Sequence, residues 1–255
     1  MKAIVLAAGY ATRLRPLTET WAKELLPVGG RPILDWIVEA IDQVDAVDEI
    51  HIVTNARKVH GFVAWAEGRN GVVVHNDGTS SNDDRLGAIG DMQFVIEQAQ
   101  LDDHLLVIAG DNLFEFSLAE FVAYWETKGV ASAVAVRDVG SLELASQYGI
   151  VALGDDGRIL DFEEKHANPP STLAATATYL YHREHARLIR PYLDGEHGAD
   201  QPGRLVGWLQ RREPVYGWEF DDTWYDIGNH EQLLAADNVL RAKHGLPVRE
   251  AYSPE

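Results

Sequence analysis

The chain contains no cysteine, and this absence excludes disulfide bonds and thiolate metal sites. It also has no hydrophobic run long enough to span a membrane. The first residues lead directly into a strand-like run, so we expect no signal peptide and a cytoplasmic protein. Basic residues are few, 22 against 40 acidic ones, for a net charge of −18. Such an excess of acid argues against a nucleic-acid partner, whose phosphates it would repel.

Several common site patterns are also missing. No G-x-G-x-x-G follows the first strand-like run, which disfavours a dinucleotide-binding oxidoreductase. No Ser-His-Asp arrangement or Walker-type lysine loop stands out, and the ten histidines are scattered along the chain. There is no internal repeat and no low-complexity linker. With 255 residues and 46% hydrophobic content, the sequence can form one large α/β domain or two small ones.

The most informative stretch lies at the start of the chain. A short apolar run, Ala3–Leu6, predicts a strand buried on both faces, and a loop of small residues, Ala7–Thr12, follows it. Arg13, Arg15 and Lys23 come next. Small residues let a ligand approach the backbone, and arginine donors suit phosphate. The stretch therefore suggests a phosphate site, although composition alone also allows an ordinary loop with solvated arginines.

The hydrophobic pattern predicts a parallel sheet. After the first strand, helical spacing over 33–41 is followed by a strand over 49–54, a helix over 59–67 and a strand over 72–74. This β-α-β-α-β order implies right-handed crossovers, with ligands bound beyond the carboxyl ends of the strands. Later strands are expected at 105–109, 131–136, 174–181 and 214–218, and helices at 92–98, 118–128, 183–193, 205–210 and 232–243.

Two aspartates and a hairpin stand out in the second half. Asp111 follows the buried strand at 105–109, and Asp226 lies between aromatic residues and a glycine. Apolar runs at 147–151 and 159–165 flank an Asp-Gly turn, which predicts a hairpin that ends in Lys165. Either aspartate could instead be a turn or helix-cap residue. Together, two carboxylates, a basic loop and a lysine suit phosphoryl or nucleotidyl transfer with Mg²⁺.

The signature at the start resembles that of the sugar-1-phosphate nucleotidylyltransferases, which reads roughly L-A-G-G-x-G-T-R-L-x-P-L-T, then a lysine, then L-x-P-V. The matching residues are Leu6-Ala7-Ala8-Gly9, Thr12-Arg13-Leu14, Pro16-Leu17-Thr18, Lys23 and Leu26-Pro27-Val28. Ala8 and Ala11 stand where the family usually has glycine. Other segments resemble further family motifs, namely Leu86–Gly90, Gly110-Asp111-Asn112, Tyr148–Lys165 and Trp224–Gly228. The likeness is greatest to the glucose-1-phosphate thymidylyltransferase type.

This resemblance implies a fold and a domain plan. The expected fold is a Rossmann-like α/β fold, a mostly parallel sheet flanked by helices, with an inserted sugar-binding hairpin. Residues 1–245 would form a single nucleotidyltransferase catalytic domain, and 246–255 a loose tail. The expected protein is a short form without the C-terminal β-helix domain that some relatives carry.

The resemblance also implies roles for individual residues. It assigns nucleotide binding to Leu6, Ala8, Gly9, Ala11, Thr12, Arg13, Gly87 and Asp111. It assigns sugar binding to Gly149, Glu164, Lys165 and Ala177, where Ala177 takes the place of a family glycine. Arg13 and Lys23 would be catalytic, and Asp111 and Asp226 would hold Mg²⁺.

The implied reaction joins a nucleoside triphosphate to a sugar-1-phosphate and releases pyrophosphate, with dTTP or UTP and glucose-1-phosphate favoured. One alternative is nucleotidyl transfer, such as cytidylyl transfer, to a polyol phosphate or phosphocholine. Another is a nucleotide-sugar-binding module without catalysis. No membrane partner is expected, and a homo-oligomer stays open.

Overall fold

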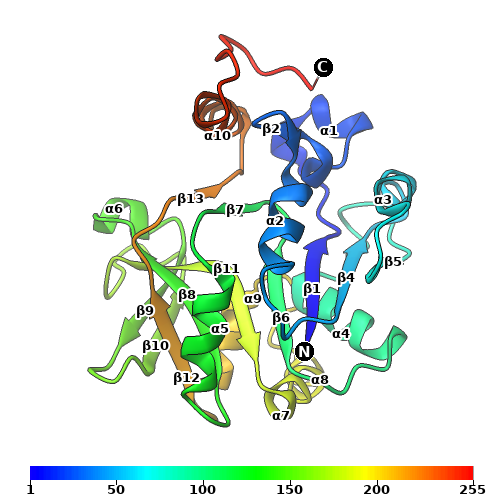
Figure 1. The fold of residues 1–255 in the computed structure, drawn as a ribbon. Coiled ribbons are helices and arrows are strands. Elements are labelled where there is room, and N and C mark those ends of the chain that lie inside the picture. The colour runs from blue at the N-terminus through cyan, green and yellow to red at the C-terminus, as the bar shows by residue number, and fades with distance from the viewer. Residues whose placement is uncertain (255) are drawn as a thin grey trace.

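The first strand, β1 (Lys2–Ala7), lies inside the main sheet in the computed structural model, which describes residues 1–254 (Figure 1). It pairs in parallel with β4 (Glu49–Thr54) and with β6 (Leu105–Ala109), and β4 pairs in parallel with β5 (Val72–Asn76). The predicted parallel sheet is thus confirmed. Leu6 of β1 is level with Ala109 of β6, so the loops after these strands start side by side at one edge of the sheet.

The second half of the sheet is mostly antiparallel and is built around β11 (Leu173–Tyr181). Along one edge this strand pairs with β8 (Ser132–Asp138), and along the other it pairs first with β9 (Gly149–Leu153) and then with β6. β9 and β10 (Ile159–Glu164) form the predicted hairpin, and β12 (Val215–Glu219) adds to β8 in parallel. The α/β fold class is confirmed, with parallel pairing concentrated in the half that contains β1.

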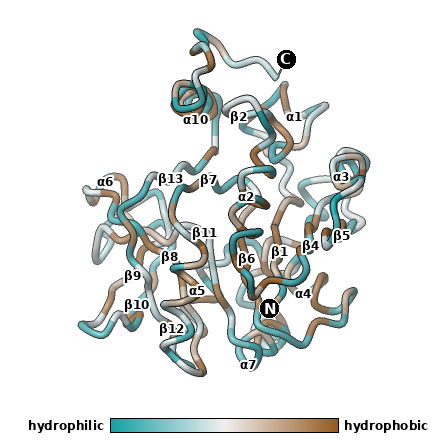
Figure 2. Tube along the Cα trace, in the orientation of Figure 1, coloured by the Kyte–Doolittle hydropathy of each residue, from teal (hydrophilic) through white to brown (hydrophobic). Residues whose placement is uncertain are grey.

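Helices cover both faces of the sheet (Figure 1). One hydrophobic core holds side chains of α2 (Ile33–Ile41), α3 (Val59–Ala66), α5 (Leu118–Glu126) and α10 (His230–Lys243). A second core, on the other face, holds side chains of α4 (Ala88–Gln98), α7 (Arg183–Ala186), α8 (Ile189–Asp194) and α9 (Pro202–Leu209). Figure 2 shows β1 and β6 in the brown shades of apolar residues, as expected for strands buried between two helical layers.

The structure differs from the predicted helices around residues 183–209. The single helix expected over 183–193 is two helices, α7 and α8. Pro191 explains the break. Proline has no N–H to donate and is tolerated only in the first turn of a helix, and Pro191 lies in the first turn of α8. α9 begins earlier than predicted, with Pro202 in its first turn, a position that proline favours.

Short elements complete the chain. A two-stranded sheet joins β7 (Asn112–Phe114) to β13 (Trp224–Asp226), and another joins β2 (Pro27–Val28) to β3 (Arg31–Pro32). The remaining pieces are η1 (Thr12–Leu14), α1 (Leu17–Thr20), η2 (Lys23–Leu25) and α6 (Leu142–Ala145). The tail after α10 contains no helix or strand over 244–254, but Tyr252 donates a hydrogen bond to the Pro27 carbonyl. None of the helices within residues 1–254 is long and apolar enough to cross a membrane.

Candidate active site

The loop after β1 has a defined shape. Ala11 adopts a left-handed backbone conformation, with φ 43° and ψ 46°, and its carbonyl accepts hydrogen bonds from the Leu14 N–H and the Thr18 hydroxyl. Asn55, the residue after β4, donates a side-chain hydrogen bond to the Ala8 carbonyl. A Cβ built on Gly9 would meet no protein atom within 4 Å, so the backbone is open to a ligand there. The small-residue loop predicted from the sequence is therefore held by hydrogen bonds at Ala8 and Ala11 and is accessible to a ligand at Gly9.

The conformation of Ala11 leads to a stability prediction. A left-handed conformation brings the alanine Cβ close to the following carbonyl, whereas glycine adopts it freely. We expect Ala11→Gly to raise the free energy of unfolding by up to about 1 kcal/mol in urea titrations. Ala8→Gly is the matched control, because Ala8 is buried and has no positive φ, so the same change should destabilise. If both substitutions changed the free energy of unfolding in the same direction, the prediction would be contradicted.

Asp111 and Lys23 form an ion pair at the edge of the sheet. Asp111 follows β6 after Gly110, and its Oδ2 lies 2.5 Å from the Lys23 Nζ. Lys23 is only 7% exposed, so this lysine charge is held in a largely buried position. A Cβ on Gly110 would come within 2.8 Å of the Glu24 side chain and 2.9 Å of the Leu6 carbonyl. Glycine at position 110 therefore lets the end of β6 approach both β1 and the segment that contains Lys23 and Glu24.

Asp226 is brought beside Asp111 by the pairing of β13 with β7. In that antiparallel ladder Asp226 faces Asn112, the residue after Asp111. Burial and the neighbouring Asp111 carboxylate raise the pKa of Asp226, which Lys23, Arg13 and Lys165 lower in turn. Asn112 fixes the arrangement, because its amide donates to the Thr178 hydroxyl and accepts from the Trp224 indole.

Basic side chains surround the two carboxylates. A Cβ on Gly228 would lie 3.3 Å from a guanidinium nitrogen of Arg13, so Arg13 packs against the backbone just after Asp226. Lys165, at the end of β10, also acts electrostatically on Asp226. The structure thus brings together Arg13, Lys23, Asp111, Lys165 and Asp226, although they come from five separate segments. Such a set can bind and neutralise phosphate groups together with a cation.

The donor set suits Mg²⁺ better than a metal that needs many protein ligands. Among the described residues, no group of three or more His, Cys, Asp or Glu side chains is arranged to hold an ion. Mg²⁺ is usually bound by one or two carboxylates, with water and substrate phosphates completing its shell. Asp111 and Asp226 form such a pair, and their mutual repulsion is the kind that a cation would relieve. The predicted ligands therefore fit the ion.

A cavity of about 310 Å³ opens beside the carboxylates. Its lining includes all four residues assigned to the sugar, namely Gly149, Glu164, Lys165 and Ala177. Asp226 also lines it, together with residues at and just before the start of α9: Asp200, Gln201, Pro202 and Gly203. Burial raises the pKa of Glu164, while Lys165 and Arg204 lower it. Ala177, like Ala11, has a left-handed backbone, with φ 52°. The cavity has the polar lining that hydroxyl groups need.

The contribution of α9 to this cavity was missed from the sequence. The predicted helix began at residue 205, but Pro202 and Gly203 already belong to α9 and line the cavity. A Cβ on Gly203 would come within 2.2 Å of the Phe162 ring, so only glycine fits there. Pro202 at the start of an amphipathic stretch was the available signal for an earlier helix start.

The segment over 77–87 is ordered by its own side chains. Asp77 accepts hydrogen bonds from the Thr79 N–H and hydroxyl, and the Tyr10 hydroxyl bonds to Thr79, which ties the segment to the loop after β1. Gly87 has φ 80°, and a Cβ on it would lie 2.7 Å from the Ala199 backbone. Gly87 is thus required for packing, and its predicted contact with the nucleotide stays a prediction.

A buried carboxyl in this region predicts a pH effect on stability. Burial and the neighbouring Asp77 raise the pKa of Asp91 from 3.8 to about 8. The folded chain then keeps a proton that the unfolded chain loses, so stability falls as pH rises between these two values. Asp91→Asn mimics the protonated form, and we expect it to raise the melting temperature by several degrees at pH 9 and hardly at pH 4.

Thermal scans of Asp91→Asn at several pH values, with exposed Asp83→Asn as the control, check this expectation. The same rise in melting temperature at pH 4 and pH 9 would show that the effect is not one of proton uptake.

Comparison with known proteins agrees with the geometry. The family model for nucleotidyl transferases matches residues 2–243. A bifunctional protein GlmU from Methanocaldococcus jannaschii is 32% identical over 250 residues, which are 98% of this chain and 56% of that protein. A UTP–glucose-1-phosphate uridylyltransferase from Synechocystis is 30% identical over 89% of this chain and 60% of its own length. The chain thus spans little more than half the length of these curated relatives.

A solved structure shows the same fold. It comes from Bacillus anthracis, carries the provisional name glucose-1-phosphate thymidylyltransferase and was determined in complex with a sucrose. It superposes with a TM-score of 0.81 at 25% identity, covering 94% of this chain and 95% of that one. An α/β fold with a phosphate-suited site is the class that these features define. The chain belongs to the nucleotidyl transferase family, and the resemblance seen in the sequence is confirmed.

Proposed function

We propose that this chain transfers a nucleotidyl group from a nucleoside triphosphate to a sugar-1-phosphate. The observation that carries the proposal is the gathering of Arg13, Lys23 and Lys165 around the Asp111–Asp226 pair, with the sugar-type cavity alongside. These three basic side chains would neutralise the phosphates of both substrates. UTP or dTTP and glucose-1-phosphate are the favoured substrates, in line with the names of the Synechocystis and Bacillus anthracis proteins.

The reaction divides between the two sides of the site. On the nucleotide side, the open backbone at Gly9 and the guanidinium of Arg13 bind the triphosphate, and Lys23 neutralises charge near the α-phosphorus. Asp111 and Asp226 would hold Mg²⁺, which offsets the negative charge of phosphate oxygens. Arg13 is exposed, as a residue that must reach an incoming substrate should be.

On the sugar side, Glu164 accepts hydrogen bonds from hydroxyl groups and Lys165 orients the sugar phosphate. An oxygen of that phosphate forms a bond to the α-phosphorus, and the bond from this phosphorus to pyrophosphate breaks. The attacking oxygen is already ionised, so the step needs no general base. Catalysis then rests on positioning and charge neutralisation.

A substrate matrix tests the proposal. Five nucleoside triphosphates are each combined with glucose-1-phosphate, other sugar-1-phosphates, a polyol phosphate and phosphocholine, and pyrophosphate release is measured. We expect UTP or dTTP with glucose-1-phosphate to give the highest kcat/KM. Release only with polyol phosphate or phosphocholine would favour the alternative acceptor class, and no release from any pair would contradict the proposal.

A further inference from the structure

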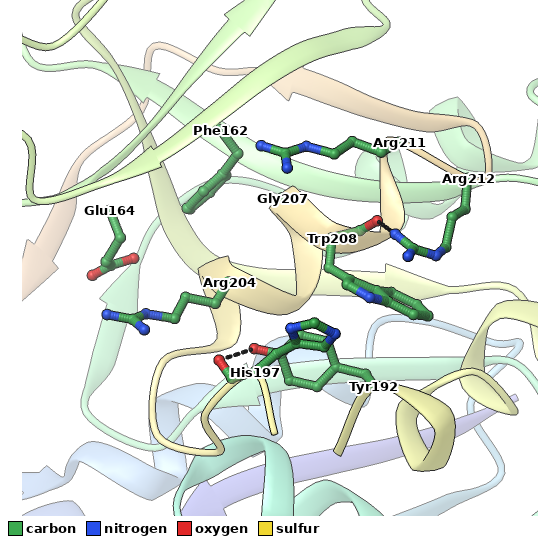
Figure 3. A pocket seen from close by; sticks show the side chains of 9 residues that line it. All are labelled: Phe162, Glu164, Tyr192, His197, Arg204, Gly207, Trp208, Arg211 and Arg212. Carbon is green, nitrogen blue, oxygen red and sulfur yellow. Dashed lines mark hydrogen bonds between the residues drawn. The ribbon is translucent and has the colours of Figure 1, made fainter. Parts of the chain in front are cut away.

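A second and larger cavity adjoins the sugar-type cavity at Phe162. It has a volume of about 730 Å³ and is lined by residues of β10, α8, α9 and the loops that follow these helices (Figure 3). Phe162 and Glu164 line both cavities, so they form a shared wall. The volume falls within the range of cavities that bind small metabolites. Neither the sequence nor the reaction proposed above uses this space.

The lining of this cavity carries an excess of positive charge. Arg204, Arg211 and Arg212 line it, against the single acid Glu164, in a chain with a net charge of −18. Within residues 1–254, the guanidinium groups of Arg204 and Arg211 make no ion pair and no hydrogen bond, although Arg204 acts electrostatically on Glu164. Donors left unused at a cavity suit a ligand that brings its own negative charge.

Aromatic side chains form the rest of the lining. Tyr192, His197 and Trp208 pack against one another, with ring centroids of Tyr192 and Trp208 5.6 Å apart. The Arg212 guanidinium lies 3.9 Å over the Trp208 ring. Figure 3 shows the Trp208 ring between Arg212 and the His197–Tyr192 pair. Aromatic faces bind planar or sugar rings, and arginine stacked on an aromatic ring still presents donors in its plane.

We propose that this cavity binds a ring-bearing phosphate ester, separate from the two substrates of the reaction. The phosphate is bound by Arg204 and Arg211, and the ring packs against Phe162 beside the Arg212–Trp208 stack. Arg204 and Arg211 lie two turns apart on or just after α9, roughly 10 Å along its axis, so a ligand of metabolite size can contact both. A nucleotide and a hexose phosphate share this chemistry.

The shared wall gives the site a consequence for catalysis. A ligand against Phe162 and Glu164 would touch the back of the sugar-type cavity, since the Phe162 ring also packs on Gly149 and Gly203. We expect such a ligand to change the KM for the sugar phosphate more than the KM for the triphosphate. This consequence rests on the proposed function, whereas binding at the cavity does not.

Calorimetric titration tests the proposal with two probes, glucose 6-phosphate and a nucleoside 5′-monophosphate. Neither probe can complete the transfer reaction, and together they separate a sugar from a nucleobase as the ring. We expect at least one probe to bind the intact chain with a micromolar to low millimolar Kd. The double variant Arg204→Gln/Arg211→Gln should bind that probe at least about tenfold more weakly.

Arg158→Gln is the matched control, because Arg158 is another exposed arginine without an ion pair among the described residues and lies at the β9–β10 turn. Its affinity should equal that of the intact chain. Absence of binding by both probes would overturn the proposal. So would binding that survives Arg204→Gln/Arg211→Gln but is lost in Lys165→Ala, which would place the probe in the sugar-type cavity. Pyrophosphate release measured without probes tests the proposed function separately.

Discussion

Asp111→Asn is expected to lower kcat/KM for pyrophosphate release by about a thousandfold or more. The substitution removes one of the two carboxylates suited to Mg²⁺ and also the partner of Lys23, 2.5 Å away. Because Lys23 is nearly buried, its charge then lacks compensation, and we expect the free energy of unfolding to fall by about 1–3 kcal/mol. Steady-state kinetics and urea titration give the two quantities.

Asp226→Asn separates the loss of activity from the loss of stability. It should reduce activity to a similar extent, because it removes the other carboxylate. Its effect on folding should be neutral or favourable, since Asp226 is partly buried and repelled by Asp111. Full turnover in both variants would contradict the assignment of these aspartates, and equal destabilisation by both would contradict the electrostatic account.

Lys23→Met is expected to reduce kcat by about a hundredfold to a thousandfold, with the KM for the sugar phosphate nearly unchanged. The proposed role of Lys23 is to neutralise charge near the reacting phosphorus, which matters most when charge shifts in the transition state. The methionine keeps the length and apolar stem of the lysine. It leaves Asp111, whose side chain is partly exposed, without its partner.

Lys128→Met is the control for Lys23→Met. The Lys128 ammonium lies over the rings of Tyr124 and Tyr216 and makes no ion pair among the described residues. Its removal should leave kcat unchanged. A kcat for Lys23→Met within a few-fold of that of the unaltered chain would show that Lys23 has a structural role only.

The sequence predicted the helices and strands well where their residues are buried in a regular pattern. The strands over 49–54 and 105–109 and the helix over 33–41 were predicted with their observed bounds, because continuous apolar runs and 3.6-residue spacing are strong signals. The three-residue strands β7 and β13 carry no such signal. Their pairing joins residues 110 to 114 positions apart, and no local pattern encodes that.

For the candidate site, the residues could be predicted but some of their contacts could not. The sequence predicted which residues would be involved, from the motif and from strand ends, and the structure brings Asp111, Asp226, Arg13, Lys23 and Lys165 together. The sequence could not predict the ion pair of Lys23 with Asp111 or the place of α9 beside the sugar-type cavity. Both depend on contacts between segments far apart in the chain. The roles of the individual residues stay predictions until the substitutions are made.

The buried Asn112 side chain has a consequence for the dynamics of the site. It links β7 to β11 and β13, with its amide bonded to the Thr178 hydroxyl and the Trp224 indole, and it is only 3% exposed. The position of the neighbouring carboxylates is thus tied to the central core. Amide hydrogen exchange of residues 111–113 should then require global unfolding, whereas the exposed segment over 80–86 should exchange by local opening. The side of the site that contains Asp111 and Asp226 would stay rigid while its rim fluctuates.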